Sequence, residues 1–398
     1  PRAAPPALAA ARAGCPRPKA LTTVPRWVRT ESDLIQLARR LEGLGEIAID
    51  TEGDSLHHYP ERLALIQVAD RGGQAWLVDP LALSSLAPLA PVFAAPRPMV
   101  VLHAGDNDLG YLKRRFGFTF VGIFDTSLAA RFLGVRTLGL DVLLRQYLEV
   151  ELPPSRQKDD WSLRPLSEAQ ERYAAADVEH LLALKDRLSD ELERIGRLAW
   201  VDEECAALAA ELPPERAPDP QAHLRLKGAR ELSPRGQASV QALHVLRERL
   251  AVAADRPPFK ILSDATLVAL AQAAPTTLAA LATVPGCTER VVARWGSAIV
   301  EAVATALALA ESALPTTAPP PRSPGVPAVV RRRIEALRAW RVTAAPELGL
   351  DPGVLLPNRL IRLIAEAGPR GREALARVPG VRRWRVEALG EQILRTIS

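Results

Sequence analysis

Cysteine is scarce in this chain of 398 residues, which contains only Cys15, Cys205 and Cys287. The three are far apart, odd in number and without CxxC spacing, so the sequence supports neither a disulfide framework nor a cysteine-bound zinc site. Unpaired cysteines are typical of a reducing compartment, and we therefore expect a cytoplasmic protein.

Long hydrophobic runs are also missing, although 48% of the residues are hydrophobic. No apolar stretch approaches the ~18 residues that cross a bilayer, so we expect no membrane partner. The N-terminal segment is rich in Ala, Pro and Arg, and it lacks the basic start and clean apolar stretch of a signal peptide. We interpret residues 1–22 as a flexible tail.

The net charge of +5 is unevenly distributed along the chain. Residues 223–398 contain 25 Lys and Arg against 14 Asp and Glu, a balance of +11, whereas residues 1–222 contain 26 against 32, a balance of −6. An acidic half beside a basic half suits a metal site that is brought to a polyanion. A solvated, arginine-rich surface would give the same composition, so charge alone does not decide the function.

Strand-like segments come first in the acidic half and helix-like segments follow. Short apolar runs predict five strands, of which the first three form an antiparallel meander, at 46–51, 62–69, 74–78, 98–104 and 122–126. Helical spacing predicts helices over 106–115, 139–148 and 167–195, with Asp106 or Asn107 as the cap of the first. This order predicts an α/β domain in which helices flank a mixed sheet.

The basic half contains an internal repeat. Residues 261–286 align without gaps to residues 355–380, and both segments end in Val-Pro-Gly. Two copies are too few for a solenoid, so we expect two small all-α domains. Pro-rich breaks then predict six segments: a tail (1–22), an α/β domain (23–210), a linker (211–230), a first helical domain (231–313), a Pro-rich linker (314–327) and a second helical domain (328–398).

Four acidic residues stand in three distinctive settings of the α/β half. Asp50 and Glu52 are two apart on a predicted strand and share a face, where their mutual repulsion makes burial costly without a cation. Asp108 lies in the first turn of the helix after a buried strand, where ligand sites gather. Tyr173 and Asp177 are four apart on one helix face. Together these acids could hold a pair of divalent metals, which indicates phosphodiester cleavage.

The local sequences around these acids resemble one family. DTE (50–52), the stretch from His103 to Leu112, and YAAADV (173–178) resemble the three motifs of the DEDD 3′–5′ exonucleases, in the subclass with Tyr in the third motif, and the whole of 24–398 resembles the ribonuclease D family. Three further segments share this resemblance: LALIQ (63–67), FDTSLAARFLG (124–134) and KDDWSLRPL (158–166). The repeat units resemble the HRDC domain of RecQ helicases and ribonuclease D.

The resemblance implies a ribonuclease H-like exonuclease domain with a mixed five-stranded sheet, followed by two HRDC-like domains. It implies two-metal hydrolysis, in which Asp50 bridges the ions, Glu52 and Asp177 hold the ion that binds the attacking water, Asp108 supports the second ion, and Tyr173 orients that water. Oxygen-only ligands favour Mg²⁺ or Mn²⁺. The implied activity is 3′–5′ exoribonuclease action that releases 5′-mononucleotides, with the 3′ ends of tRNA precursors and other stable RNA as the substrates. We expect the enzyme to be a monomer.

Other positions are weaker candidates for substrate contact. Four residues match family positions near the substrate groove or motifs: Gln67, His103, Trp161 and Arg164. Gly53 departs from the family, which often has an aromatic residue there. The segment His57 to Tyr59 could contact the substrate, but we interpret it as a solvent-exposed loop. The arginines at 331–333 and the segment 382–385, which includes Trp384, are candidates for RNA contact.

Two alternatives remain open at this point. A DNA exonuclease would use the same active site, and the sequence shows no reader of the 2′-hydroxyl that would separate RNA from DNA. A catalytically silent nucleic-acid-binding protein would keep the fold, although the presence of all four carboxylates and Tyr173 argues against it.

Overall fold

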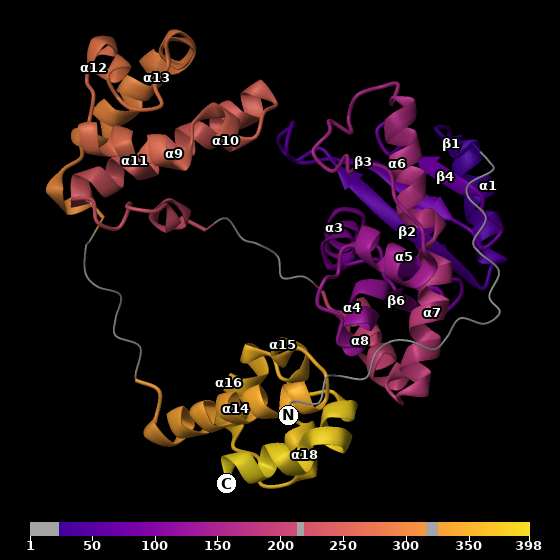
Figure 1. Ribbon diagram of the computed structural model, residues 1–398. Helices are drawn as coiled ribbons and strands as arrows, with labels where there is room; N and C mark the ends of the chain where they lie inside the picture. Colours follow the sequence, from indigo (N-terminus) through magenta and orange to yellow (C-terminus); the bar gives the residue numbers. More distant parts are fainter. Residues whose placement is uncertain (1–23, 213–218, 316–324) are drawn as a thin grey trace.

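A computed structural model describes residues 24–212, 219–315 and 325–398, so the predicted tail and Cys15 lie outside the described residues. The three ranges correspond to an α/β domain, a first helical unit and a second helical unit, and these names are used below (Figure 1). None of the helices in the described ranges combines the length and hydropathy that crossing a membrane requires.

The α/β domain is built on one six-stranded mixed sheet in the order β1-β4-β3-β2-β5-β6. Its strands are β1 (Arg26–Val28), β2 (Glu46–Gly53), β3 (Leu63–Ala69), β4 (Ala75–Val78), β5 (Met99–Leu102) and β6 (Ile123–Asp125). The pairs β2–β3 and β3–β4 are antiparallel, which confirms the predicted meander, and the other pairs are parallel. Five strands were predicted; β1 was missed because three residues are too few to show a period.

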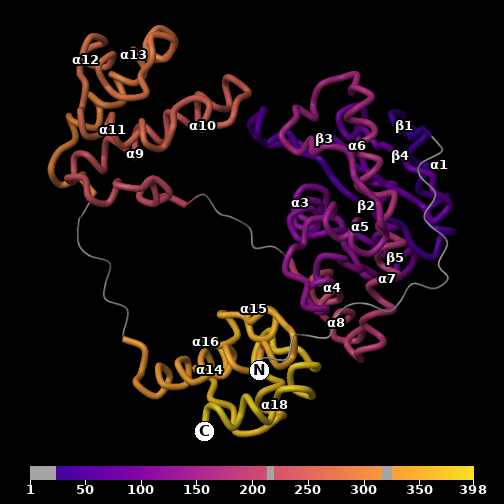
Figure 2. The backbone as a smooth tube through the Cα atoms, viewed as in Figure 1, coloured from indigo at the N-terminus to yellow at the C-terminus, as the bar shows by residue number. Residues whose placement is uncertain are grey.

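Helices cover this sheet and connect its strands (Figure 2). They are α1 (Glu31–Glu42), η1 (Ala87–Leu89), α2 (Ala90–Ala94), α3 (Asp106–Phe116), α4 (Thr126–Phe132), α5 (Leu140–Leu148), α6 (Glu168–Glu179), α7 (Leu181–Arg194) and α8 (Leu198–Ala210). Helix α6 packs on β2, β3 and β4, whereas α7 packs on β2 and β5. The mixed sheet with flanking helices confirms the predicted fold class.

Two local expectations were wrong. The single helix predicted over 167–195 is broken at His180, whose backbone (φ −105°, ψ 0°) separates α6 from α7. The two helices share β2, but α6 extends over β3 and β4 whereas α7 extends over β5. Neither Asp106 nor Asn107 caps α3, because Gly105 is the cap residue and Asp106 is already helical. Instead, the carboxylate of Asp125 accepts hydrogen bonds from the backbone N–H groups of Ala104 and Gly105, and so fixes the start of α3 from the neighbouring strand.

The two helical units share one plan. The first contains η2 (Ala222–Arg225), α9 (Pro234–Ala254), α10 (Pro258–Ile261), α11 (Asp264–Ala273), α12 (Leu278–Ala282), α13 (Glu289–Leu307) and η3 (Glu311–Ala313); the second contains α14 (Ala328–Glu347), α15 (Pro352–Leu355), α16 (Asn358–Ala367), α17 (Arg372–Ala376) and α18 (Arg383–Ile397). In both copies the Val-Pro-Gly segment turns the chain before the last helix. The glycines, Gly286 and Gly380, have φ of +87° and +85°, a conformation that suits glycine.

The second helical unit is docked on α8 of the α/β domain, and the buried cores of the two are continuous. Trp384 is 2% exposed and stacks on Trp200 at 4.6 Å between ring centroids. The carboxylate of Glu203 accepts hydrogen bonds from the backbone N–H groups of Arg383 and Trp384, so it caps the start of α18. Arg385 is 4% exposed and pairs with Glu204. The expectation that Trp384 and Arg385 contact RNA was therefore wrong.

The first helical unit contacts the α/β domain at the loop between β2 and β3. Tyr59 packs against the core of this unit and its hydroxyl donates to the Glu248 carboxylate at 2.5 Å. His58 Nδ1 lies 2.7 Å from Asp255 Oδ2, and its Nε2 lies 2.8 Å from Ser162 Oγ. The loop from His57 to Tyr59 is thus a docking contact rather than the solvent-exposed loop that the sequence suggested.

Candidate active site

Strand β2 and helix α6 bring three of the four predicted carboxylates together. Carboxylate oxygens of Asp50, Glu52 and Asp177 all lie within 4.8 Å of one another. Asp50 and Glu52 share a face of β2 because side chains alternate along a strand. Helix α6 packs on β2, β3 and β4, and its first turn is fixed by a capping box in which Ser167 and Gln170 bond reciprocally. A rigid strand and a capped helix therefore position the cluster.

Asp108 stands outside this trio, in the first turn of α3. The hydroxyl of Thr51 donates a hydrogen bond to Asp108 and so ties the helix start to β2 between the two acids of that strand. Asp108 is nevertheless the neighbouring charge that acts most strongly on Asp50. Thr51 was not identified from the sequence as a functional residue. The only feature that could have indicated it is the position of its hydroxyl between the two acids of one strand.

Burial disfavours the charged forms of all four carboxylates, and repulsion within the cluster adds to this effect at Asp50 and Glu52. Burial, followed by the charges of Asp108, Asp177 and Glu52, raises the pKa of Asp50 well above its ordinary value. Burial and the charge of Asp177 raise the pKa of Glu52 to about 9, and burial raises that of Asp177 to about 7. The pKa of Asp108 is also raised by burial, although the Thr51 hydrogen bond opposes the shift.

The donor set fits a divalent cation. Among the described residues, only burial and like charges raise the pKa values of Asp50 and Glu52, and no positive side chain neutralises them. Carboxylates clustered in this way are stable as anions only when a cation compensates them. All the donors are oxygens, which suit Mg²⁺ or Mn²⁺ better than zinc.

Tyr173 lies against the cluster. Its hydroxyl hydrogen-bonds the carboxylate of Asp177, one helical turn later, and its ring packs on Trp161 with 6.0 Å between ring centroids. Burial, followed by the charges of Asp177 and Glu52, raises the pKa of Tyr173. The hydroxyl therefore stays protonated at neutral pH and acts as a hydrogen-bond donor beside the acids.

The four weaker substrate candidates have structural partners or no free surface. Gln67 and Trp161 are 0% exposed, so substrate cannot reach them in this structure. Gln67 pairs with Asp50 across the strands, on the same face, and its amide has no hydrogen-bond partner among the described residues. Arg164 donates to both Asp79 oxygens, at 2.7 and 2.8 Å. His103 Nδ1 lies 2.9 Å from the Thr126 hydroxyl. Arg164 and His103 are therefore occupied by contacts within the protein in this structure.

The raised pKa values predict how the metal-free protein responds to pH. Glu52 and Asp177 have ordinary pKa values of 4.5 and 3.8 and folded values of about 9 and about 7, so the folded state keeps protons that the unfolded chain has lost. Stability then falls as pH rises through this range. In chelator, we expect a melting temperature lower by several degrees at pH 8 than at pH 5.5, and we expect Mg²⁺ to reverse most of the loss.

The Glu52→Gln variant provides the control for this experiment, because it removes one ionising group without changing the side-chain volume. Its melting temperature in chelator should fall less between pH 5.5 and pH 8 than that of the unchanged protein. An equal fall in both proteins would show that groups elsewhere cause the pH dependence.

Known proteins share both the sequence and the fold. A family of 3′–5′ exonuclease domains matches residues 25–193, and the HRDC domain matches residues 237–303 and 330–397. The ribonuclease D of Pseudomonas paraeruginosa is 33% identical over 379 residues, which cover 94% of this chain and 97% of that protein.

Two solved structures agree with this match. Escherichia coli RNase D, described as an exoribonuclease involved in structured RNA processing, is similar with a TM-score of 0.68 and 26% identity over 94% of this chain and 98% of that chain. The catalytic core of RRP6 from Trypanosoma brucei is similar with a TM-score of 0.66 and 27% identity over 74% of this chain and 83% of that chain. The carboxylate cluster, the two HRDC matches and the full-length likeness agree: the chain belongs to the ribonuclease D family.

Proposed function

We propose that this chain is a metal-dependent 3′–5′ exoribonuclease whose active site consists of Asp50, Glu52, Asp108, Asp177 and Tyr173. The observation that carries the assignment is the convergence of three half-buried or buried carboxylates from β2 and α6 within 4.8 Å, without a protein cation among the described residues to neutralise them. Family membership supports the same activity.

The reaction is hydrolysis of the last phosphodiester bond of an RNA strand. A water oxygen attacks the phosphorus in line with the 3′-oxygen of the penultimate nucleotide, and the bond from phosphorus to that oxygen breaks. The water gives up a proton, the departing 3′-oxygen takes one up as the new 3′-hydroxyl of the shortened strand, and a 5′-mononucleotide is released. Two divalent ions, when bound, activate water and neutralise charge on the attacking and leaving oxygens.

Each protein residue has a distinct part in this reaction. Asp50, Glu52 and Asp177 supply the oxygens that would hold the ions, and Thr51 keeps Asp108 beside them. The Tyr173 hydroxyl donates its single proton to Asp177 in this structure. Once ions hold the Asp177 carboxylate, the hydroxyl would donate instead to the attacking water and so fix its direction.

The finer assignments extend this proposal. We expect Mg²⁺ or Mn²⁺ as the ions, tRNA precursors as the RNA class, and a monomer as the active form. The cytoplasmic location expected from the unpaired cysteines stays a prediction; among the described residues, Cys205 and Cys287 are both free and buried. We also propose the domain boundaries predicted from the sequence, with the exonuclease domain at 23–210 and the helical domains at 231–313 and 328–398.

End-labelled RNA tests the activity directly. We expect stepwise loss of 3′ nucleotides from a single-stranded RNA with Mg²⁺ or Mn²⁺, slower loss from DNA of the same sequence, and removal of the 3′ extension from a tRNA precursor. Gel analysis of the shortened products measures all three. Equal or faster attack on DNA would identify a DNA exonuclease, and binding without cleavage in either metal would identify a silent nucleic-acid-binding protein.

A further inference from the structure

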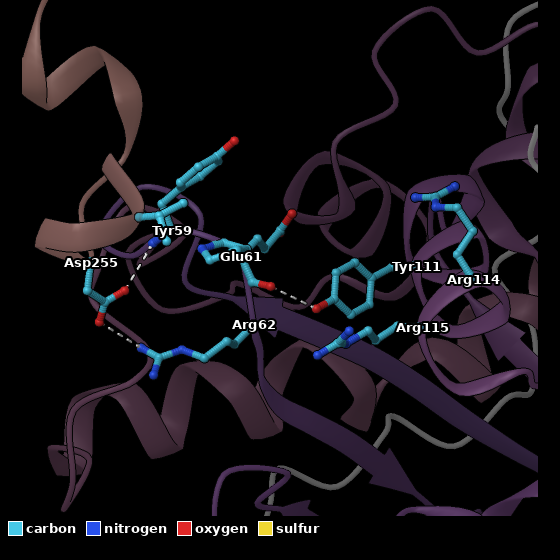
Figure 3. A pocket seen from close by; sticks show the side chains of 9 residues that line it. Tyr59, Glu61, Arg62, Tyr111, Arg114, Arg115 and Asp255 are labelled. Atoms are coloured by element: carbon cyan, nitrogen blue, oxygen red, sulfur yellow. Dashed lines mark hydrogen bonds and ion pairs between the residues drawn. The ribbon is translucent and has the colours of Figure 1, made fainter. Parts of the chain in front are cut away.

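A pocket of about 650 Å³ lies where the first helical unit meets the α/β domain (Figure 3). The β2–β3 loop and α3 form most of its wall, and Val252 and Asp255 at the end of α9 complete it. The pocket therefore has this shape only while the first helical unit is docked through His58 and Tyr59.

Helix α3 connects this pocket to the carboxylate cluster. Asp108, Tyr111 and Arg115 stand at positions i, i+3 and i+7, so they follow one face of the helix. Seven residues of helix span about 10 Å, which a single strand of RNA crosses within a few nucleotides. Glu61, which also lines the pocket, lies against the strand that carries Glu52: its Oε1 is 2.8 Å from where a Cβ on Gly53 would be.

The pocket wall carries three arginines, Arg62, Arg114 and Arg115, against two acids, Glu61 and Asp255. Arg114 and Arg115 are exposed in the last turn of α3 and form no salt bridge within 4.0 Å of a described carboxylate, although the charge of Arg114 acts on Glu61 and opposes the rise in the pKa of that carboxyl. Figure 3 shows both guanidinium groups extending from α3 on the side opposite Asp255. Arg62 is less available, because its Nε donates to Asp54 at 2.8 Å. Two exposed guanidinium groups beside a phosphodiesterase site are suited to phosphate oxygens.

An aromatic side chain completes the recognition surface. Tyr111 is half-buried in the pocket wall, and its hydroxyl donates to the backbone carbonyl of Glu61 at 3.2 Å, which holds the ring in place. Two of the four tyrosines in the chain line this pocket, but Tyr59 is used for docking, so Tyr111 is the ring available for stacking. Stacking on a fixed ring suits any base and gives no sequence preference.

We propose that this pocket binds the single-stranded RNA segment on the 5′ side of the nucleotide being removed, with Arg114 and Arg115 on its phosphates and Tyr111 stacked on a base. This inference rests on the proposed exoribonuclease function and adds a binding subsite to it. The first helical unit has a matching role: by docking on the β2–β3 loop, it closes the subsite that keeps the strand aligned with the carboxylates.

Binding of labelled single-stranded RNA in chelator tests the subsite without requiring cleavage. The double variant Arg114→Gln/Arg115→Gln should weaken binding about tenfold and flatten the slope of log affinity against log salt by about 1.4, since each of two phosphate contacts on a single strand contributes ~0.7. Tyr111→Leu should weaken binding to a similar degree but leave the salt slope unchanged, because it removes stacking rather than charge.

A matched control removes two positive charges elsewhere on the α/β domain. Arg39 and Arg145 are exposed on α1 and α5, so Arg39→Gln/Arg145→Gln should keep the original affinity and slope. The subsite would be overturned if the Arg114/Arg115 variant had the same RNA affinity and the same salt slope as this control. In the presence of Mg²⁺ or Mn²⁺, the Arg114/Arg115 variant should lose at least tenfold more kcat/KM on a single-stranded RNA than on a dinucleotide. An equal loss of kcat/KM on both substrates would also overturn the subsite. Failure of the proposed exoribonuclease function gives a different result: the wild-type protein would bind RNA but would not shorten it.

Discussion

Replacing Asp50 with Asn is expected to lower the rate of RNA shortening by about 10³-fold or more. Asp50 is the carboxylate on which the other three act together, so its loss should empty the site of the ions that supply several kcal/mol of transition-state stabilisation. The RNA affinity of the variant should stay within about twofold of the wild-type value. The proposed phosphate contacts are made by the last turn of α3, whereas the carboxylate cluster lies beside its first turn. Single-turnover cleavage and anisotropy measure the two quantities.

A second readout separates loss of the ions from a misplaced substrate. Mg²⁺ should raise the melting temperature of the unchanged protein but have little effect on Asp50→Asn, because the variant has lost a ligand. Asp106→Asn is the matched control, since Asp106 is exposed in the same first turn as Asp108 and should behave like the unchanged protein. Full activity in Asp50→Asn, or an unchanged response to Mg²⁺, would remove Asp50 from the site.

Replacing Trp384 with Ala is expected to lower the free energy of unfolding by about 3–5 kcal/mol, the usual cost of removing a buried tryptophan. Trp384 packs on Trp200 and Phe132 of the α/β domain, and its indole N–H donates to Glu204 at 3.0 Å. Its removal therefore opens a cavity between two domains and deletes the hydrogen bond from the indole N–H to Glu204. Chemical denaturation followed by tryptophan fluorescence and circular dichroism measures the loss.

Trp340→Ala is the control for this prediction. Trp340 belongs to the same helical unit but is half-exposed, and its indole N–H donates to Gln392 at the surface. Its replacement should cost about 1 kcal/mol or less. An equal loss in the two variants would show that Trp384 does not join the domains.

The sequence predicted those parts of the molecule in which a local pattern determines the structure. The apolar runs of the meander alternate with clear turns, and the spacing of Asp50 and Glu52 on a strand, or of Tyr173 and Asp177 on a helix, places each pair on one face. Because the strands and α6 pack as expected, the separate pairs converge.

Contacts between distant segments could not be predicted in the same way. An Arg- and Trp-rich segment such as 382–385 has the composition of an RNA-binding surface, and only the position of Glu203 and Glu204 on α8 shows that it is an interface between domains. The loop at His58 has the same ambiguity, since its partner Asp255 is 197 residues away. The hydroxyl of Thr51 gave no periodic signal at all.

Close packing of backbone also depends on contacts that sequence patterns do not contain. Gly134 lies just after α4, and a Cβ on it would lie 2.2 Å from the carbonyl oxygen of Gly349 in the second helical unit. Its φ of +81° would strain other residues as well. One glycine thus serves both the helix end and the contact between domains.

The docking of the second helical unit has a consequence for the first one, which precedes it in the chain. The first unit is joined at one end to α8 and at the other to a unit that is itself fixed on α8. Tethering at both ends makes its contact with the β2–β3 loop an intramolecular one, at an effective concentration of the order of millimolar. The few hydrogen bonds at His58 and Tyr59 can therefore be individually weak and still keep the unit in place. Because both tethers hold the unit beside the loop, the contact re-forms after each opening without the arrival of a second molecule.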